Sequence, residues 1–246
     1  MEKLNNGFTL TLCEGAFPLS TDSMALAGFV KLPRNAKVLD LGSGCGTLGL
    51  LLCAKDQNCC VTGVEIDQSA HNAALHNAER NNIANRLNSI CQDVCHIPCF
   101  IKPGSYHICL SNPPYFTDGP KSKTVPVARR EDLLPLDGLF SGAAWALRYG
   151  GDFYLVHRPE RLAELFVTAA KYNLEPKVLQ QLHHHIGGPV SLVLIKFRKG
   201  AKPGLQWQTQ YLFDKKVGEC LLCDVFLQLC VIKINACWFE RSNLQL

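Results

Sequence analysis

The segment Ser111–Tyr115, which reads Ser-Asn-Pro-Pro-Tyr, holds the side chains of this chain that are best suited to chemistry. The side-chain oxygen of Asn112 and the carbonyl of Pro113 can together accept both N–H protons of an exocyclic amine or amide, and Tyr115 can stack on its π-face. Pro113 and Pro114 fix φ and leave no competing backbone N–H. These groups would turn the delocalised lone pair of a planar nitrogen toward a methyl donor. An ordinary Asn-Pro turn after a buried strand is the alternative.

A glycine-rich turn lies upstream, within Val38–Leu50, between an apolar strand and an apolar helix. This order of elements is typical of nucleotide-binding units. The spacing is Asp-x-Gly-x-Gly-x-Gly, and it differs from the Gly-x-Gly-x-x-Gly of pyrophosphate binders. It favours S-adenosylmethionine, which carries an amino-acid tail and a sulfonium in place of phosphates, although a tight turn without a ligand would also explain it. The spaced residues are Asp40, which could face a cation, and Gly42, Gly44 and Gly46.

Two further acids follow the next predicted strands. Glu65 ends an apolar run about 20 residues after the glycines, where a carboxylate can accept both ribose hydroxyls of a nucleoside. Asp67 is predicted to cap the following helix instead, and Ser69 competes with it for that position. Asp93 follows another apolar segment and is placed where an adenine amino group needs an acceptor. A solvated Asp at the end of a strand explains Asp93 equally well.

Together these motifs resemble the class I S-adenosylmethionine-dependent methyltransferases, and among them the amino-group methyltransferases with an [Asn/Asp]-Pro-Pro-[Tyr/Phe] signature. The resemblance extends over about residues 15–218. The entry segment Phe17–Ala27, Phe116 after the tetrad, and Ala128–Glu131 make the chain similar to the bacterial tRNA1(Val) (adenine-37-N6)-methyltransferases. His107 departs from that group, in which an acid usually stands at this position. The position precedes the tetrad by five residues, so little of the chemistry depends on it.

The resemblance implies a function and a role for each motif residue. The implied reaction is methylation of the exocyclic N6 amino group of an adenine in tRNA, at the anticodon-loop adenine next to the anticodon of a tRNA-Val. The implied cofactor, S-adenosylmethionine, would be bound by Asp40, Gly42, Gly44, Gly46, Glu65 and Asp93. The implied catalytic tetrad is Asn112, Pro113, Pro114 and Tyr115.

Three other functions remain open on the sequence. Glutamine N5-methylation of peptide release factors uses the same tetrad on an amide, but we expect no N-terminal helical domain here and the entry segment differs. Guanine N2-methylation of ribosomal RNA is less favoured, because those relatives usually carry Phe in the tetrad and a duplicated domain. A binding module for S-adenosylmethionine or RNA without catalysis belongs to a different class, and the intact tetrad argues against it.

A basic stretch without hydrophobic periodicity, residues 116–130, follows the tetrad. A loop of this length in a compact domain is usually functional or disordered, and its position predicts a substrate lid. Its cations could meet phosphates of a tRNA substrate, and a formal net charge of +4 permits RNA binding without requiring it. An ordinary solvated loop is the alternative. The predicted substrate-binding residues are Phe116, Lys121, Lys123, Arg129 and Arg130, and Lys196, Arg198, Lys199 and Lys202 could extend the patch.

An α/β fold with a doubly wound, mostly parallel seven-stranded sheet of the Rossmann-like, class I methyltransferase type would position these motifs. The glycine turn and the tetrad would then lie at the carboxyl ends of adjacent strands. The last strand would insert antiparallel, as the resemblance implies. Strands are predicted at 37–41, 60–66, 87–92, 106–111, 152–157, 176–182 and 190–198. Helices are predicted after a cap at Thr21 or Asp22 and at 46–55, 69–81, 131–148 and 159–172.

The chain is predicted to consist of an entry segment and helix (1–35), a methyltransferase domain (36–218) and an atypical cysteine-rich tail (219–246). Hydrophobic residues make up 47% and charged residues 19%, which excludes a disordered chain. No apolar run approaches the roughly 20 residues that span a bilayer, and the polar start lacks a signal peptide. We therefore expect a cytoplasmic protein with no membrane association and infer no obligate protein partner.

The thirteen cysteines are expected to be reduced and mostly structural in such a compartment. The cluster from Cys91 to Cys99, with His96, is the one that resembles a metal site, but no partner CxxC pair with suitable spacing follows nearby. We therefore predict no metal. The triplet His183–His185 is predicted to lie in a solvated loop between two strands.

Overall fold

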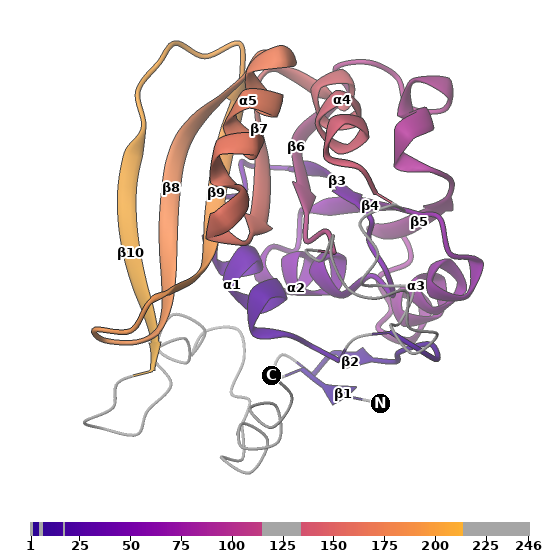
Figure 1. Cartoon of the computed structure of the whole chain (residues 1–246). Coiled ribbons are helices and arrows are strands. Elements are labelled where there is room, and N and C mark those ends of the chain that lie inside the picture. Colours follow the sequence, from indigo (N-terminus) through magenta and orange to yellow (C-terminus); the bar gives the residue numbers. More distant parts are fainter. Residues whose placement is uncertain (1, 5–6, 17, 115–133, 214–246) are drawn as a thin grey trace.

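The structure is a computed structural model, and it describes residues 2–4, 7–16, 18–114 and 134–213 (Figure 1). The predicted tail at 219–246 lies outside these residues. The described part is built around one large sheet, with helices on both of its faces. A separate two-stranded sheet pairs β1 (Glu2–Lys3) with β2 (Thr9–Leu10) near the start of the chain.

The large sheet has the order β10-β8-β9-β7-β6-β3-β4-β5. Neighbouring strands are parallel except that β9 runs antiparallel to both β7 and β8. This arrangement confirms the doubly wound, mostly parallel fold and the antiparallel insertion. The strands are β3 (Lys37–Leu41), β4 (Cys60–Glu65), β5 (Leu87–Cys91), β6 (Tyr106–Ser111), β7 (Leu147–His157), β8 (Leu174–His185), β9 (Val190–Lys199) and β10 (Gln206–Phe213).

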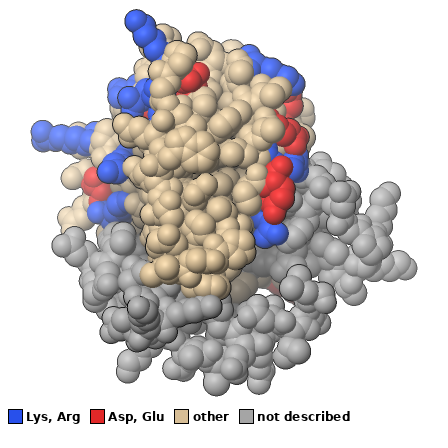
Figure 2. All heavy atoms as spheres, turned by 60° about the vertical axis from the view of Figure 1, so that its left-hand side comes forward, with Lys and Arg blue, Asp and Glu red and all other residues tan. Residues whose placement is uncertain are grey.

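The sheet has eight strands where seven are predicted, because β10 adds a parallel strand beside β8. β8 is also longer than predicted and includes His183–His185, so the prediction of a solvated loop there was wrong. His183 pairs with Val190 of β9 and with Tyr211 of β10, and backbone pairing therefore holds the triplet extended. The face beside β10 shows a broad uncharged band bordered by Lys, Arg, Asp and Glu (Figure 2).

The helices divide between the two faces of the sheet. Alternate strand residues point to opposite faces, so Ile108 and Leu110 belong to one core cluster and Cys109 to the other. The first three helices pack on the face that carries Ile108, and the last two pack on the opposite face. The helices are α1 (Thr21–Phe29), α2 (Thr47–Lys55), α3 (Gln68–Arg80), α4 (Leu136–Ala146) and α5 (Leu162–Lys171), with 3-10 turns η1 (Val94–Cys99) and η4 (Pro159–Arg161).

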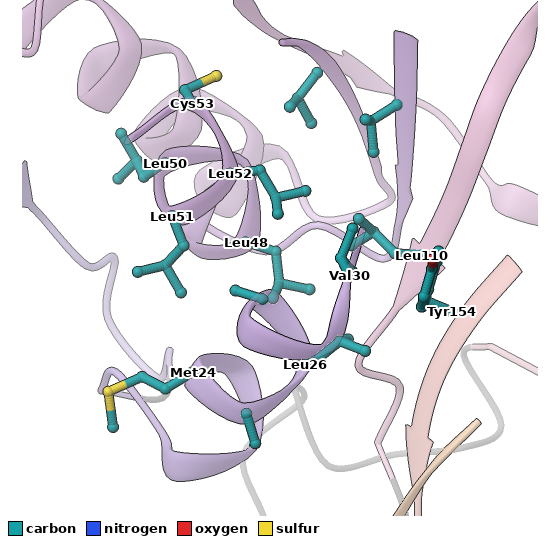
Figure 3. Packing of buried hydrophobic residues seen from close by; sticks show 14 of the residues in the cluster. Met24, Leu26, Val30, Leu48, Leu50, Leu51, Leu52, Cys53, Leu110 and Tyr154 are labelled. Carbon is teal, nitrogen blue, oxygen red and sulfur yellow. The ribbon is translucent and has the colours of Figure 1, made fainter. Parts of the chain in front are cut away.

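Helix α1 is held against the rest of the domain by apolar packing. Met24 and Leu26 of α1 lie in one cluster with Leu48 of α2, Leu110 of β6 and Tyr154 of β7 (Figure 3). Burial of side chains of this size stabilises the fold by about 1.5–3 kcal/mol each. Since β6 ends immediately before the tetrad, this cluster fixes the position of α1 relative to Asn112.

The cap of α1 differs from the expectation that the helix begins after Thr21 or Asp22. Ser20 is the N-cap, and its side-chain oxygen accepts the backbone N–H of Ser23. A serine hydroxyl satisfies one of the amide groups that have no partner in the first turn of a helix.

Candidate active site

The carboxyl ends of β3 and β6 bring the glycine turn and the tetrad to one edge of the sheet. The two strands are parallel neighbours, with Asp40 of β3 opposite Leu110 of β6. The buried hydroxyl of Ser111 donates to the carbonyl oxygen of Leu41 at 2.7 Å. This bond joins the two strand ends, which confirms that both motifs lie at the carboxyl ends of adjacent strands.

The three glycines of the turn all have positive φ: 74° at Gly42, 54° at Gly44 and 81° at Gly46. A side chain is strained in this backbone region, so the turn requires glycine. A Cβ on Gly46 would also lie 3.2 Å from Cβ of Ala74, whereas one on Gly44 would meet no described atom within 4 Å. The backbone of Gly44 therefore faces open space within the described part of the chain, as close approach of a ligand requires.

Glu65 binds the glycine turn from the next strand. Its carboxylate is 9% exposed and accepts the backbone N–H of Gly44 at 2.8 Å and that of Asp67 at 2.9 Å. A carboxylate offers about four acceptor positions, so two remain for ligand hydroxyls. Asp67 caps α3 by accepting the N–H of Ala70 at 2.8 Å, which confirms its predicted role over that of Ser69.

Asp40 is the most unusual group of the site. Its carboxyl group is 1% exposed, and neither oxygen has a hydrogen-bond partner among the described residues. Burial, and to a smaller extent the charge of Glu65, together raise the pKa of Asp40 to about 8. A buried carboxylate without a partner is costly unless a cation neutralises it. The site therefore fits a positively charged ligand such as S-adenosylmethionine.

We expect binding of S-adenosylmethionine to release a proton. Below about pH 8 the carboxyl of Asp40 in the free protein holds its proton, and a cation bound beside it would favour the ionised form. Affinity should therefore rise with pH between about pH 6 and pH 7, where the cofactor's own α-amino group stays charged. Calorimetry in buffers of different ionisation enthalpy measures the release, and Asp40→Asn should abolish it. Equal proton release from both proteins would reject this role of Asp40.

Asp93 follows β5, so the three predicted acids lie at the ends of three neighbouring strands. One oxygen of Asp93 accepts the N–H of Cys95 at 2.8 Å and caps η1, and the other lies 4.0 Å from Nδ1 of His96. The side chain of Asp93 is 31% exposed. The residue thus has a structural role in η1, and its contact with adenine stays a prediction.

The amide of Asn112 contacts a residue that the sequence did not single out. Its Nδ2 donates to Oγ of Ser23 on α1 at 3.1 Å. Ser23 is 8% exposed, and it immediately precedes the buried apolar run Met24–Ala27 of its helix. The signal in the sequence that could have identified Ser23 is a polar residue next to a run that is predicted to be buried. Pro113 is buried and Pro114 is half-buried next to Asn112.

Part of the predicted site lies outside the described residues. Within the described ranges, no three His, Cys, Asp or Glu side chains are arranged to hold a metal ion. None of the helices in those ranges is long and apolar enough to cross a membrane. The predicted residues outside the ranges are Tyr115, Phe116, Lys121, Lys123, Arg129 and Arg130.

Comparison with known proteins agrees with this geometry. The family model of the methyltransferase small domain matches residues 19–168. A tRNA1(Val) (adenine(37)-N6)-methyltransferase of Phocaeicola vulgatus is 28% identical over 193 residues, which are 78% of this chain and 81% of the relative. A relative of the same name from Aliivibrio salmonicida is 34% identical over 146 residues, which are 55% of this chain and 60% of the relative. The structure of a predicted O-methyltransferase from Agrobacterium tumefaciens has the same fold, with a TM-score of 0.70 and 19% identity. The match covers 83% of this chain and 95% of that protein.

Proposed function

We propose that this chain, which belongs to the methyltransferase small domain family, transfers a methyl group from S-adenosylmethionine to the N6 amino group of an adenine in tRNA. The observation that carries the proposal is that β6, which ends at the tetrad, and β3, which ends at the glycine turn, are parallel neighbours joined by the Ser111–Leu41 hydrogen bond. The relatives named as tRNA1(Val) (adenine(37)-N6)-methyltransferases support this substrate and the adenine next to the anticodon of a tRNA-Val. Such a substrate also supports a cytoplasmic location.

The acids at the strand ends would hold the cofactor. Asp40 would neutralise its positive charge, Glu65 would accept the ribose hydroxyls, and Asp93 would accept the adenine amino group. The backbone of the glycine turn allows close approach. When bound, S-adenosylmethionine supplies an electrophilic methyl group on its sulfonium.

The tetrad would present the acceptor nitrogen. The oxygen of Asn112 and the carbonyl of Pro113 would accept the two N–H protons of the adenine amine, and Tyr115 would stack on the base. The lone pair then points along the direction of attack, and the two acceptors stabilise the positive charge that develops on the nitrogen. No strong base is required, because the proton becomes acidic only as the N–C bond forms. Loop bases cost least to unstack, which suits an anticodon-loop target.

Two adjoining hollows beside α1 offer a surface for the body of the tRNA. They have volumes of about 590 and 500 Å³ and share Val178, Lys196 and Gln206 in their linings. Lys31 lines the first, Lys177 and Arg198 line the second, and neither lining includes a carboxylate. We call these two hollows the basic groove. Cations and amide side chains suit the phosphates and hydroxyls of RNA.

The cations predicted to extend the patch differ in their surroundings. Arg198 is engaged by Asp152, with N–O distances of 2.7 and 2.9 Å. Lys199 is not part of the groove lining, and its Nζ instead donates to the carbonyls of Ala144 and Leu147 at the end of α4. Lys202 is exposed but lines neither hollow. Lys196 therefore remains from that set, and Lys31 and Lys177 join it, although Nζ of Lys177 also donates to the carbonyl of Lys202 at 2.9 Å.

Replacing Lys31, Lys177 and Lys196 with Gln should weaken tRNA binding and flatten its dependence on salt. Each lost phosphate contact lowers the slope of log affinity against log salt by about 0.7–0.9, so three contacts would lower it by about 2–3. Affinity for S-adenosylmethionine should not change. Filter binding over a range of salt concentrations measures the slope.

A matched control replaces three exposed cations near the opposite ends of the parallel strands, Lys37, Lys102 and Arg148. The control should keep the original slope. An unchanged slope in the groove variant, or equal changes in the two triple variants, would show that the basic groove does not meet phosphates.

The proposed function is tested with radiolabelled S-adenosylmethionine and two acceptors. One is bulk tRNA from cells that lack this enzyme, and the other is unmethylated peptide release factor. We expect label in tRNA, recovered as N6-methyladenosine after digestion to nucleosides. Label in the release factor and not in N6-methyladenosine would overturn the proposal in favour of glutamine methylation. Label in neither, with S-adenosylmethionine still bound, would favour a binding module.

A further inference from the structure

The first hollow of the basic groove combines amide, aromatic and basic side chains. It has a volume of about 590 Å³ and is lined from α1 and from the strands β7 to β10. Alternate residues of a strand point to the same face, and Gln206, Gln208 and Gln210 of β10 all line this hollow. Pockets that bind a small organic group have volumes of about 300–1,000 Å³. The hollow therefore has the size and the polarity of a binding pocket.

Two of the amides form a pair between β8 and β10. Gln180 Nε2 donates to Oε1 of Gln210, and both side chains are half-buried. Neither amide makes a second hydrogen bond within the described part of the chain. Whichever of the two amides donates, at least one carbonyl oxygen and one NH2 group of the pair stay available to a ligand. A donor and an acceptor side by side match the edge of a nucleobase, whereas a phosphate offers acceptors only.

Aromatic and basic side chains complete the lining. Phe29 of α1 and Tyr211 of β10 are half-buried and line the hollow, so part of each ring is accessible. Stacking on such rings holds unpaired bases of any type. Lys31 and Lys196 line the same hollow, and its lining includes no carboxylate. The phosphates on either side of an inserted base would therefore meet cations.

Helix α1 connects the hollow to the tetrad. Ser23 in the first turn of α1 contacts Asn112, and Phe29 at the end of the same helix lines the hollow. The six residues between Ser23 and Phe29 correspond to about 9 Å along a helix axis. Tyr211 is paired with His183 near the carboxyl ends of β10 and β8, at the same edge of the sheet as the tetrad. A nucleotide close to the methylated adenine could therefore reach the hollow.

We propose that this hollow is a pocket for an unstacked nucleobase of the tRNA, close in sequence to the adenine that is methylated, and that Gln180 and Gln210 contact the edge of that base. The inference rests on the proposed function of the chain. Single-stranded loops are the parts of an RNA whose bases can be turned out, stacked on aromatic rings and contacted at their edges. The pocket would let the enzyme select a tRNA by a nucleotide that it does not methylate.

The test uses the tRNA that takes the label, rebuilt by ligation so that each anticodon-loop nucleotide other than the target adenine is replaced in turn by an abasic residue. With the unmodified protein, one replacement near the target should lower affinity about tenfold, as expected for the loss of one stacked base. The other replacements should each cost less than about twofold. Filter binding measures affinity without turnover.

Gln180→Leu keeps a side chain of similar size and removes the amide. It should lower affinity for the intact tRNA about tenfold, because it leaves polar groups of the base unpaired. With the abasic tRNA that binds weakly, the same change should cost less than about twofold, because the contact is already absent. Gln210→Leu gives a second measurement and should repeat this pattern.

The matched control is Gln181→Leu, the next residue of β8, which is also half-buried but points to the opposite face of the sheet. It should bind both tRNAs as the unmodified protein does. Thermal unfolding and affinity for S-adenosylmethionine show that each variant is folded.

The pocket would be overturned by an abasic scan in which no position matters, or by losses from Gln180→Leu and Gln210→Leu that are equal on intact and abasic tRNA. Methylation of the intact tRNA by the unmodified protein would still stand in both cases. If the unmodified protein neither binds nor methylates tRNA, the proposed function fails and the pocket fails with it. The two failures are therefore distinguishable.

Discussion

Replacing Asn112 with Ala is expected to reduce methyl transfer to tRNA about a hundredfold or more and to leave affinity for S-adenosylmethionine unchanged. In the proposed mechanism the amide is one of two acceptors aimed at the amine, and loss of one such preorganised group typically costs on this order. The proposed cofactor contacts come from other residues, the glycine turn and Glu65, so binding should persist. Steady-state rates with labelled cofactor and calorimetry of cofactor binding measure the two effects.

A matched control is Asn72→Ala, which removes an exposed Asn amide on α3. Its rate should equal that of the unmodified protein. Full activity of Asn112→Ala would remove the tetrad from the mechanism. A parallel loss of activity and cofactor binding would instead mean that Asn112 supports the structure of the turn.

The mostly parallel sheet, and the placement of the glycine turn and the tetrad on adjacent strand ends, could be predicted from the sequence because the signals are local. Apolar strands alternate with helical patterns, and β3, β4 and β6 each end at a residue with a chemical role. The rule that parallel neighbours end at one edge then brings Asp40, Glu65 and Asn112 together. The pairing of β3 with both β4 and β6 follows this expectation.

The edge of the sheet could not be predicted in the same way. β10 is rich in Gln, and its first five residues, Gln206–Gln210, are exposed or half-buried. Backbone pairing with β8, rather than burial of an apolar face, holds β10 in the sheet. Hydrophobic periodicity carries no signal for such a strand. The same pairing explains why His183–His185 is extended in spite of its polar composition.

The contact between Ser23 and Asn112 is unpredictable for a different reason. It joins two polar residues across the interface of α1 and β6, and its existence depends on how the apolar cluster sets the helix. Periodicity identifies the buried side of a helix, but not which strand end a polar residue on that side will meet.

Glu65→Ala is expected to lower affinity for S-adenosylmethionine about tenfold or more. The change removes the proposed acceptor for two ribose hydroxyls, and charge-assisted hydrogen bonds contribute about 1.5–3 kcal/mol. It also releases the backbone N–H groups of Gly44 and Asp67, so the glycine turn loses its anchor. Because the charge of Glu65 contributes to the raised pKa of Asp40, the variant should also release fewer protons on binding. Calorimetry measures affinity and proton release in the same titration.

Two further variants separate the contributions of Glu65. Glu65→Gln keeps the size of the side chain and one acceptor oxygen, but it turns an NH2 group toward one of the backbone N–H donors, so its affinity should fall below that of the unmodified protein. Glu79→Ala removes an exposed carboxylate from α3 and should change nothing. If Glu65→Ala bound S-adenosylmethionine as tightly as the Glu79 control, the ribose assignment would be rejected. Preference for NAD over S-adenosylmethionine in the unmodified protein would reject the class of cofactor, because a site built around the buried carboxyl of Asp40 should favour a cation over a pyrophosphate.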